Sequence, residues 1–175
     1  MLDHDVIRTP DATTEPEAYR EALLAIVGDR DPLEVLADTP ARVRALLRGP
    51  AAGGVDQPPA PGEWSAATVV GHLVDVDIVY GFRWRLALTA DRPTYPGYDE
   101  KLWSALPKPP ADQLGVLFES LRAYNLWTLR SVPRGDWSRV AVHAEQGAET
   151  VELAVRKVAG HDLAHLNQLE RALAG

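Results

Sequence analysis

The chain has 175 residues, of which 46% are hydrophobic and 25% are charged, so it is long enough for one domain with a substantial core. Its 18 basic and 25 acidic side chains give a net charge of −7, which argues against a nucleic-acid partner because phosphates repel an acidic surface. The absence of cysteine excludes disulfides, thiolate catalysis by the chain and cysteine-ligated zinc.

The N-terminal segment and the hydropathy of the chain bear on its location. Residues 1–14 contain three aspartates and no apolar run, so they do not resemble a signal peptide. We expect a flexible lead-in over these residues and a single domain over residues 15–175. No stretch approaches the roughly 20 apolar residues of a membrane-spanning helix. A cytoplasmic location without a membrane partner is therefore predicted.

Two helices are predicted before residue 50. Thr14 and Glu17 have the spacing of a capping box, with a proline in the first turn, and they predict a helix that ends near Gly28. Asp31, followed by proline and then by a glutamate in the first turn, predicts the start of the second helix.

Two proline-containing segments interrupt this region. Thr39-Pro40 falls inside the second helix, where either the helix kinks or a new helix begins with Thr39 as its cap. Residues 49–62 contain four glycines and four prolines and predict a loop.

The longest predicted helix begins at Ser65, where Trp64 and Val69 are spaced as a hydrophobic staple. Apolar residues then recur with a period of 3.6 residues as far as residue 91. His72 stands inside this apolar stripe, next to Leu73. The helix is therefore predicted to carry a histidine on its inward face.

The second half of the chain predicts two further helices. Residues 91–110 form a long loop, and a helix follows at residues 110–131. Residues 137–143 alternate weakly and predict an extended segment, and a last helix runs from about Thr150 to Ala174.

His161 and His165 lie four residues apart in the last helix, so their imidazoles share one face and can converge on one ion. Taken alone, the pair also fits two half-exposed histidines or two core histidines held by hydrogen bonds. His72 changes this balance, because three inward imidazoles all need partners and one shared metal satisfies them together.

Glycines precede two of these histidines. Gly71 comes before His72, and Gly160 comes before His161. A glycine inside a helix costs about 1 kcal/mol relative to alanine, so each needs a reason. A close approach of the two helix backbones and ordinary side-chain packing are equally good explanations.

Three neutral histidines without a carboxylate leave coordination positions open, as in catalytic metal sites. Zinc, nickel, iron or manganese all suit such ligands. Asp75 either orients His72 or faces solvent, the second being favoured by its position. His143 either reaches the site from its loop or, as its position favours, is a surface histidine. Tyr98 and Trp103 either contact substrate or simply pin the long loop.

These residues together resemble the DinB-like (YfiT-like) metalloenzyme superfamily. The resemblance rests on Trp64-Ser65 at a helix start, His72, residues 160–166 and Gln168. The loop over residues 96–103, and the approach to the last helix through Trp137-Ser138-Arg139, His143 and Gly147, are similar to one branch of the family. The resemblance covers about residues 30–173.

The resemblance implies an all-α four-helix bundle, here with an additional N-terminal helical segment and long loops. It also implies a divalent metal ion bound by His72, His161 and His165. Characterised members of the family include transferases that use a low-molecular-weight thiol such as bacillithiol or mycothiol, and other members are described as metal-dependent hydrolases.

Three functions follow as hypotheses. The first is a metal-dependent enzyme that acts on a small molecule, either by transfer of a low-molecular-weight thiol or by hydrolysis. The second is a non-enzymatic, metal-stabilised binding or stress-response module, for which a homodimer is one alternative. The third is a helical bundle whose histidines never bind metal.

Overall fold

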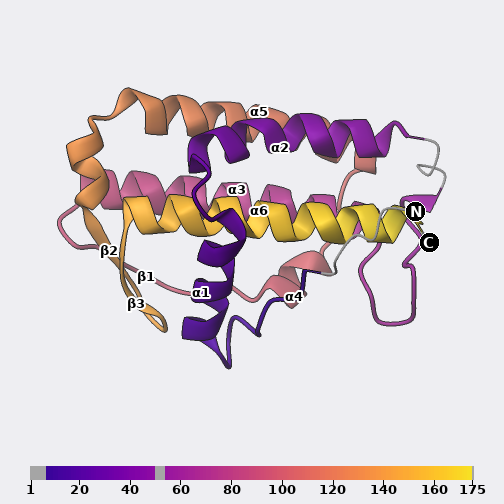
Figure 1. Cartoon of the computed structure of the whole chain (residues 1–175), viewed down its shortest axis with the longest axis horizontal. Coiled ribbons are helices and arrows are strands. Elements are labelled where there is room, and N and C mark those ends of the chain that lie inside the picture. The colour runs from indigo at the N-terminus through magenta and orange to yellow at the C-terminus, as the bar shows by residue number, and fades with distance from the viewer. Residues whose placement is uncertain (1–6, 50–53, 175) are drawn as a thin grey trace.

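The computed structural model describes residues 7–49 and 54–174 of the chain. Four helices form a bundle (Figure 1): α2 (Pro32–Leu47), α3 (Ala66–Thr89), α5 (Ala111–Ser131) and α6 (Val151–Ala174). Both α2 and α3 pack against α5 and against α6, and α1 (Pro16–Val27) lies outside the bundle against α6. The predicted four-helix bundle with an additional N-terminal helix is confirmed.

A small sheet closes one end of the bundle. Its strands, in spatial order, are β1 (Thr94–Tyr95), β2 (Val140–His143) and β3 (Gly147–Thr150). The β1–β2 pair is parallel and the β2–β3 pair is antiparallel, and the 3-10 helix η2 (Arg134–Ser138) precedes β2. The predicted extended segment is confirmed at β2.

The long loop predicted at residues 91–110 contains two short elements, β1 and the helix α4 (Glu100–Ser104). Thr94 of β1 is paired with Val142 of β2, which is far along the chain. A strand of two residues has no periodicity of its own, so only this pairing defines it. The predicted long loop is therefore interrupted at β1 and at α4, where the prediction of a loop was wrong.

Two predicted helix starts are confirmed by their hydrogen bonds. The side chain of Asp31 accepts from the backbone N–H of Leu33 at 2.8 Å. Ser65 accepts from the N–H of Thr68 at 3.2 Å and caps α3. Each cap satisfies an N–H group that the first turn of a helix leaves without a partner.

The predicted capping box at Thr14 is wrong. Glu15 is the N-cap of α1 and makes no capping hydrogen bond with its side chain. Asp11 instead accepts from the backbone N–H of Thr14 at 2.9 Å, in a turn that precedes the helix. Residues 1–6 lie outside the described residues, so the flexible lead-in over residues 1–14 stays a prediction.

Helix α2 continues through Pro40, so no new helix begins at Thr39. Proline has no N–H, which leaves the carbonyl of Leu36, four residues earlier, without its helical donor. Arg122 Nη1 of α5 donates to that carbonyl at 2.9 Å. A buried side chain of a neighbouring helix therefore supplies the hydrogen bond that the proline removes.

Arg122 is the centre of a buried polar layer. Its side chain is 1% exposed, and it donates to Asp77 of α3 at 3.0 Å and to Asp162 of α6 at 2.5 and 3.2 Å. Asn125, one turn further along α5, donates to the Asp77 side chain at 2.9 Å. Together with the contact to α2, these bonds connect all four helices of the bundle.

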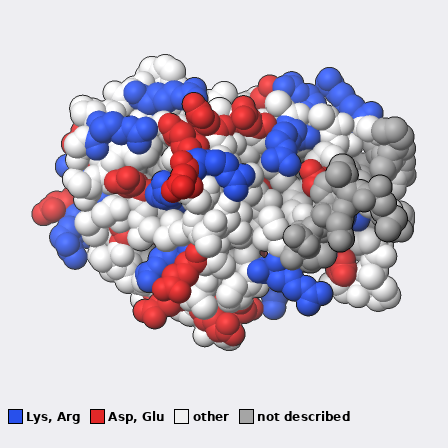
Figure 2. Space-filling model, viewed as in Figure 1, with Lys and Arg blue, Asp and Glu red and all other residues white. Residues whose placement is uncertain are grey.

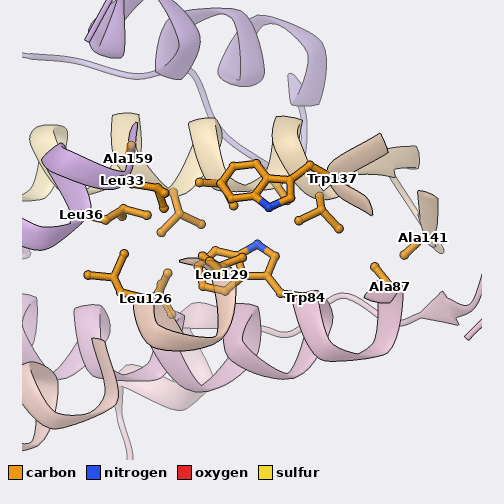
Figure 3. Packing of buried hydrophobic residues seen from close by; sticks show 14 of the residues in the cluster. Leu33, Leu36, Trp84, Ala87, Leu126, Leu129, Trp137, Ala141 and Ala159 are labelled. Carbon is orange, nitrogen blue, oxygen red and sulfur yellow. The ribbon is translucent and has the colours of Figure 1, made fainter. Parts of the chain in front are cut away.

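Apolar residues form two clusters. Trp84 and Trp137 belong to the cluster beside the sheet and enter it from opposite sides (Figure 3). The other cluster combines residues of α2, α3, α5 and α6, among them Val43, Leu73, Phe118 and Leu166. This division of the core places apolar packing in both halves of the bundle.

The surface carries charges of both signs. On the face shown in Figure 2, lysines and arginines alternate with aspartates and glutamates in small groups. Within residues 7–49 and 54–174, no helix has both the length and the apolar character that a membrane span requires. The absence of a nucleic-acid partner and the cytoplasmic location stay predictions.

Replacing Arg122 by methionine is expected to cost about 3–5 kcal/mol in the free energy of unfolding, because two buried carboxylates lose their counter-ion. The matched control is Arg44→Met, which removes a half-exposed ion pair with Glu119 and is expected to cost about 1 kcal/mol or less. Urea unfolding of both variants measures the difference. Equal losses would show that the buried layer does not hold the bundle together.

Candidate metal centre

Two adjacent helices carry the three histidines that the sequence singled out. His72 is a buried residue of α3, between Val69 and Val76 in the apolar stripe. His161 and His165 lie one turn apart on α6, which packs against α3. The 3.6-residue period of each helix therefore directs all three imidazoles to the interface between these two helices.

The three side chains meet at one point. Each offers a ring nitrogen, and these atoms lie within 4.8 Å of one another. The Nε2 atoms of His72 and His161 are 3.0 Å apart, and the ring centroids of His161 and His165 are 4.2 Å apart. Tetrahedral zinc with bonds of about 2.0–2.1 Å places its ligand atoms about 3.4 Å apart, so the observed spacing suits a shared ion.

The hydrogen bonds of the triad leave nitrogen lone pairs available. The Nδ1–H of His165 donates to the amide oxygen of Gln168 at 2.7 Å, which leaves Nε2 as the free ligand atom. His161 Nδ1 is buried and has no hydrogen-bond partner among the described residues. A buried imidazole with so few partners is unusual, and a bond from Nε2 to a metal would compensate for it.

Burial keeps the triad in the neutral state that binds metals. Burial lowers the pKa of His72 and of His161, and the neighbouring histidines lower both further. Burial also lowers the pKa of His165, to about 4. All three imidazoles are therefore unprotonated near pH 7, and their donor set fits a divalent metal of the zinc, nickel, iron or manganese kind.

Trp64 covers one side of the triad. Its ring is stacked on that of His165, with centroids 6.2 Å apart, and is tilted against His72 at 5.0 Å. Because Trp64 directly precedes the cap of α3, the start of this helix also positions an aromatic wall for the site. A cavity also reaches the triad at His161.

That cavity, called the triad pocket below, has a volume of about 390 Å³ and is lined at one point by His161. Its walls come from α1, α3, α6, the segment before α4 and the turn between β2 and β3. Its lining includes three tyrosines and three basic or imidazole side chains, namely Tyr19, Tyr80, Tyr98, Arg83, His143 and Lys157. A small molecule in the pocket would therefore reach the triad.

Asp75 has neither of its predicted roles. It accepts from Lys108 Nζ at 2.7 Å, and both side chains are largely buried. The same lysine side chain crosses over Gly71, where an added methyl group would overlap it. Asp75 therefore fixes the segment after α4 onto α3 and has no hydrogen bond to His72.

The interpretation of His143 as a surface residue is wrong. It is only 6% exposed and lines the triad pocket. Its Nδ1 accepts from the backbone N–H groups of Glu145 and Gln146, at 3.1 and 3.3 Å. Because Nδ1 is the acceptor, neutral His143 carries its proton on Nε2 and is a hydrogen-bond donor there.

The two aromatic residues of the long loop differ in their relation to the triad pocket. Tyr98 lines the triad pocket, and its ring packs against that of Trp103 with centroids 4.9 Å apart. Trp103 is not a lining residue, so it holds the loop while Tyr98 contributes to the pocket wall.

Arg83 and Lys157 were not predicted as site residues. Both are buried, at 6% and 5% exposure, and both line the pocket. Arginine and lysine are almost never fully buried without a partner, so a charged residue at an inward helix position was the available signal. Arg83 does continue the predicted inward stripe of α3.

Glycine stands at positions 71 and 160 for different reasons. Neither reason is a close approach of the α3 and α6 backbones. A methyl group on Gly160 would overlap the backbone of Leu23 in α1. A methyl group on Gly71 would overlap only the flexible side chain of Lys108. Gly160 thus lets α1 lie directly on α6 beside His161, where it forms part of the pocket wall.

Comparison with known proteins agrees with this arrangement. The family model of the DinB superfamily matches residues 36–169, which is more than half of the chain. The chain belongs to the DinB superfamily. This member of the superfamily is 30% identical over 146 residues to a protein of Bacillus cereus (strain ATCC 10987 / NRS 248) named "Putative metal-dependent hydrolase", a match that covers 81% of this chain and 84% of the relative.

Two further matches concern YfiT of Bacillus subtilis. The YfiT sequence, from strain 168, carries the same description and is 29% identical over 148 residues, covering 81% of this chain and 83% of YfiT. The solved structure of YfiT, described as a four-helix bundle of unusual topology, superposes with a TM-score of 0.72 at 23% identity. It covers 95% of this chain and 94% of YfiT, so the DinB-superfamily member shares its fold.

Replacing Gly160 by alanine is expected to cost about 1–3 kcal/mol in the free energy of unfolding, because the backbone of α1 must move. Gly71→Ala is the matched control. Its clash is with a flexible side chain, and the gain in helix propensity of about 1 kcal/mol offsets it. Urea unfolding measures both, and a larger loss in Gly71→Ala would contradict this account of the two glycines.

The metal-free protein is expected to lose stability as the pH falls from 6.5 to 4. The folded state holds the pKa of His165 at about 4, below its ordinary value of 6.5, so the unfolded state binds more protons in this window. His165 alone then removes about 1.4 kcal/mol per pH unit.

Thermal unfolding between pH 4 and 8 checks this expectation, with His165→Gln as the comparison. The variant is expected to show a shallower decline below pH 6.5, because glutamine does not titrate. The same decline in both proteins would assign the effect to other groups.

Proposed function

We propose that the chain is a metal-dependent enzyme that hydrolyses a small molecule bound in the triad pocket. The observation that carries the proposal is the convergence of three neutral imidazoles, one of which, that of His161, lines a pocket of about 390 Å³. No carboxylate of the described residues joins the three histidines, so a bound ion would keep positions open for reactants. The description of its relatives as metal-dependent hydrolases supports the reaction class.

The residues around the pocket have separate tasks in this proposal. His72, His161 and His165 hold the ion, and Gln168 fixes the orientation of the His165 ring. When bound, a divalent ion polarises an electrophile and lowers the pKa of water or of a thiol, which supplies a nucleophile near neutral pH. Trp64 excludes water from one side of the triad, and His143 offers a proton from Nε2 to a substrate atom.

Thiol transfer is the second candidate function. It is favoured because the two residues considered as general bases already accept hydrogen bonds. Asp75 is bound to Lys108, and His143 uses its free lone pair to accept from the backbone. Neither therefore is free to act as a general base for a water molecule. A bound divalent ion would lower the pKa of a low-molecular-weight thiol, so thiol transfer would not need a separate general base.

Elemental analysis of the purified protein is the first test. We expect about one divalent ion per chain in the parent protein and none in a His72→Ala/His165→Ala variant, because the triad loses two ligands. His143→Asn is the matched control, since it alters a pocket histidine that is not part of the triad and should retain the ion.

Activity assays then separate the reactions. Hydrolysis of ester or amide substrates that disappears in His161→Ala would support a hydrolase, and turnover of an electrophile only with bacillithiol or mycothiol would support a transferase. Bound metal without either activity would instead favour a metal-stabilised binding module. No metal in the parent after loading with zinc, nickel, iron or manganese would contradict the proposal. A homodimer stays a prediction.

A further inference from the structure

Arg83 is a buried cation without an anionic partner in the part of the chain that the structure describes. The residue is 6% exposed, and Nη2 donates to the backbone carbonyl of Pro96 at 3.1 Å. The rings of Tyr95 and Tyr80 lie 4.5 and 5.1 Å from the guanidinium carbon. No carboxylate of residues 7–49 and 54–174 forms an ion pair with it, although a buried charge normally has one.

The other buried cations, Arg122 and Lys157, each have a carboxylate partner of the kind that Arg83 lacks among the described residues. Arg122 is bound by two aspartates. Lys157, which lines the same pocket as Arg83, is neutralised by Glu149 at 2.6 Å. The guanidinium of Arg83 has five donors in a planar fork, and one of its nitrogens is used by Pro96. The remaining donors belong to a side chain that lines the triad pocket.

The position of Arg83 relates it to the triad. Val76 and Arg83 both line the pocket from α3, and they are seven residues apart, which is about 10 Å along a helix. Val76 lies one turn after His72, so the triad and Arg83 stand toward opposite ends of the pocket wall. A ligand that touches both must be elongated, with an anionic group at one end and its reacting group at the other.

The remaining lining residues select the kind of anion. Asp11, Glu100 and Glu145 also line the pocket, and burial together with the nearby Asp11 raises the pKa of Glu100. These carboxylates repel a doubly charged phosphate more strongly than a singly charged carboxylate. The planar fork of arginine matches a carboxylate in two parallel hydrogen bonds, and the tyrosine rings of the walls suit an apolar body.

We propose that Arg83 binds the carboxylate of a small organic acid, whose other end reaches the histidine triad. This inference rests on the proposed function in one respect, namely that the molecule bound there is the substrate. The binding of the carboxylate itself requires no metal, so the two are tested separately.

The experiment is calorimetric titration of the full chain, zinc-loaded and EDTA-treated, with hexanoate as the probe and hexanamide as its neutral counterpart. We expect hexanoate to bind about tenfold more tightly than hexanamide in both forms, because only the carboxylate forms charged hydrogen bonds. Arg83→Gln should weaken hexanoate about tenfold and leave hexanamide unchanged. The matched control is Arg130→Gln, the same loss of charge at an exposed position of α5.

Several outcomes would overturn the inference. They are equal affinities for hexanoate and hexanamide in the parent, an Arg83→Gln variant that binds hexanoate normally, and tighter Arg83-dependent binding of inorganic phosphate. Hexanoate binding that needs zinc but not Arg83 would place the carboxylate on the metal and would also overturn it. If Arg83→Gln does not fold, the comparison of hexanoate with hexanamide in the parent protein decides.

The zinc content of the same samples tests the proposed function independently. Hexanoate binding through Arg83 without any zinc binding would leave the anion site standing and contradict the metal-dependent enzyme. Zinc binding by the triad without a preference for hexanoate would support the metal site and contradict the anion site at Arg83.

Discussion

The buried ion pairs of Arg122 are the constraint on which the arrangement of the bundle depends. One guanidinium on α5 binds Asp77 on α3 and Asp162 on α6, and it also binds the carbonyl of Leu36 on α2. Apolar side chains tolerate sliding between helices, whereas a buried charge tolerates no displacement from its partner. The layer thereby fixes the mutual register of all four helices, which the two apolar clusters on their own would specify less sharply.

This register places the triad. Asp162 directly follows His161, and Asp77 is five residues after His72, so the aspartates that bind one arginine stand close to two of the three histidines in the chain. Any axial shift of α3 against α6 would separate the imidazoles and also break the ion pairs. A site for a metal ion needs ligand positions accurate to a few tenths of an ångström. The buried layer supplies that accuracy without taking part in the site.

The pocket depends on elements outside the bundle. Helix α1 reaches the wall because Gly160 lets its backbone lie on α6, and the β2–β3 turn brings His143. The segment before α4 adds Tyr98, and the segment after α4 is held to α3 by the pair of Lys108 and Asp75. The bundle thus provides the three histidines, while the additional helix, the small sheet and the loop form the other walls of the pocket.

The sequence by itself determined the helices, two of their caps and the three histidines, because helical periodicity and capping are local properties of neighbouring residues. The roles of the two glycines, of Asp75 and of His143 depend on partners far along the chain. For these residues the sequence left alternatives open or led to a wrong prediction. The backbone that Gly160 accommodates belongs to Leu23, the partner of Asp75 is Lys108, and the two N–H groups that hold His143 lie in a turn defined by strand pairing. Only the tertiary structure decided these, and it alone showed that Arg83 lines the same pocket as His161 and has no counter-ion among the described residues, since the periodicity of one helix does not reveal partners on other elements.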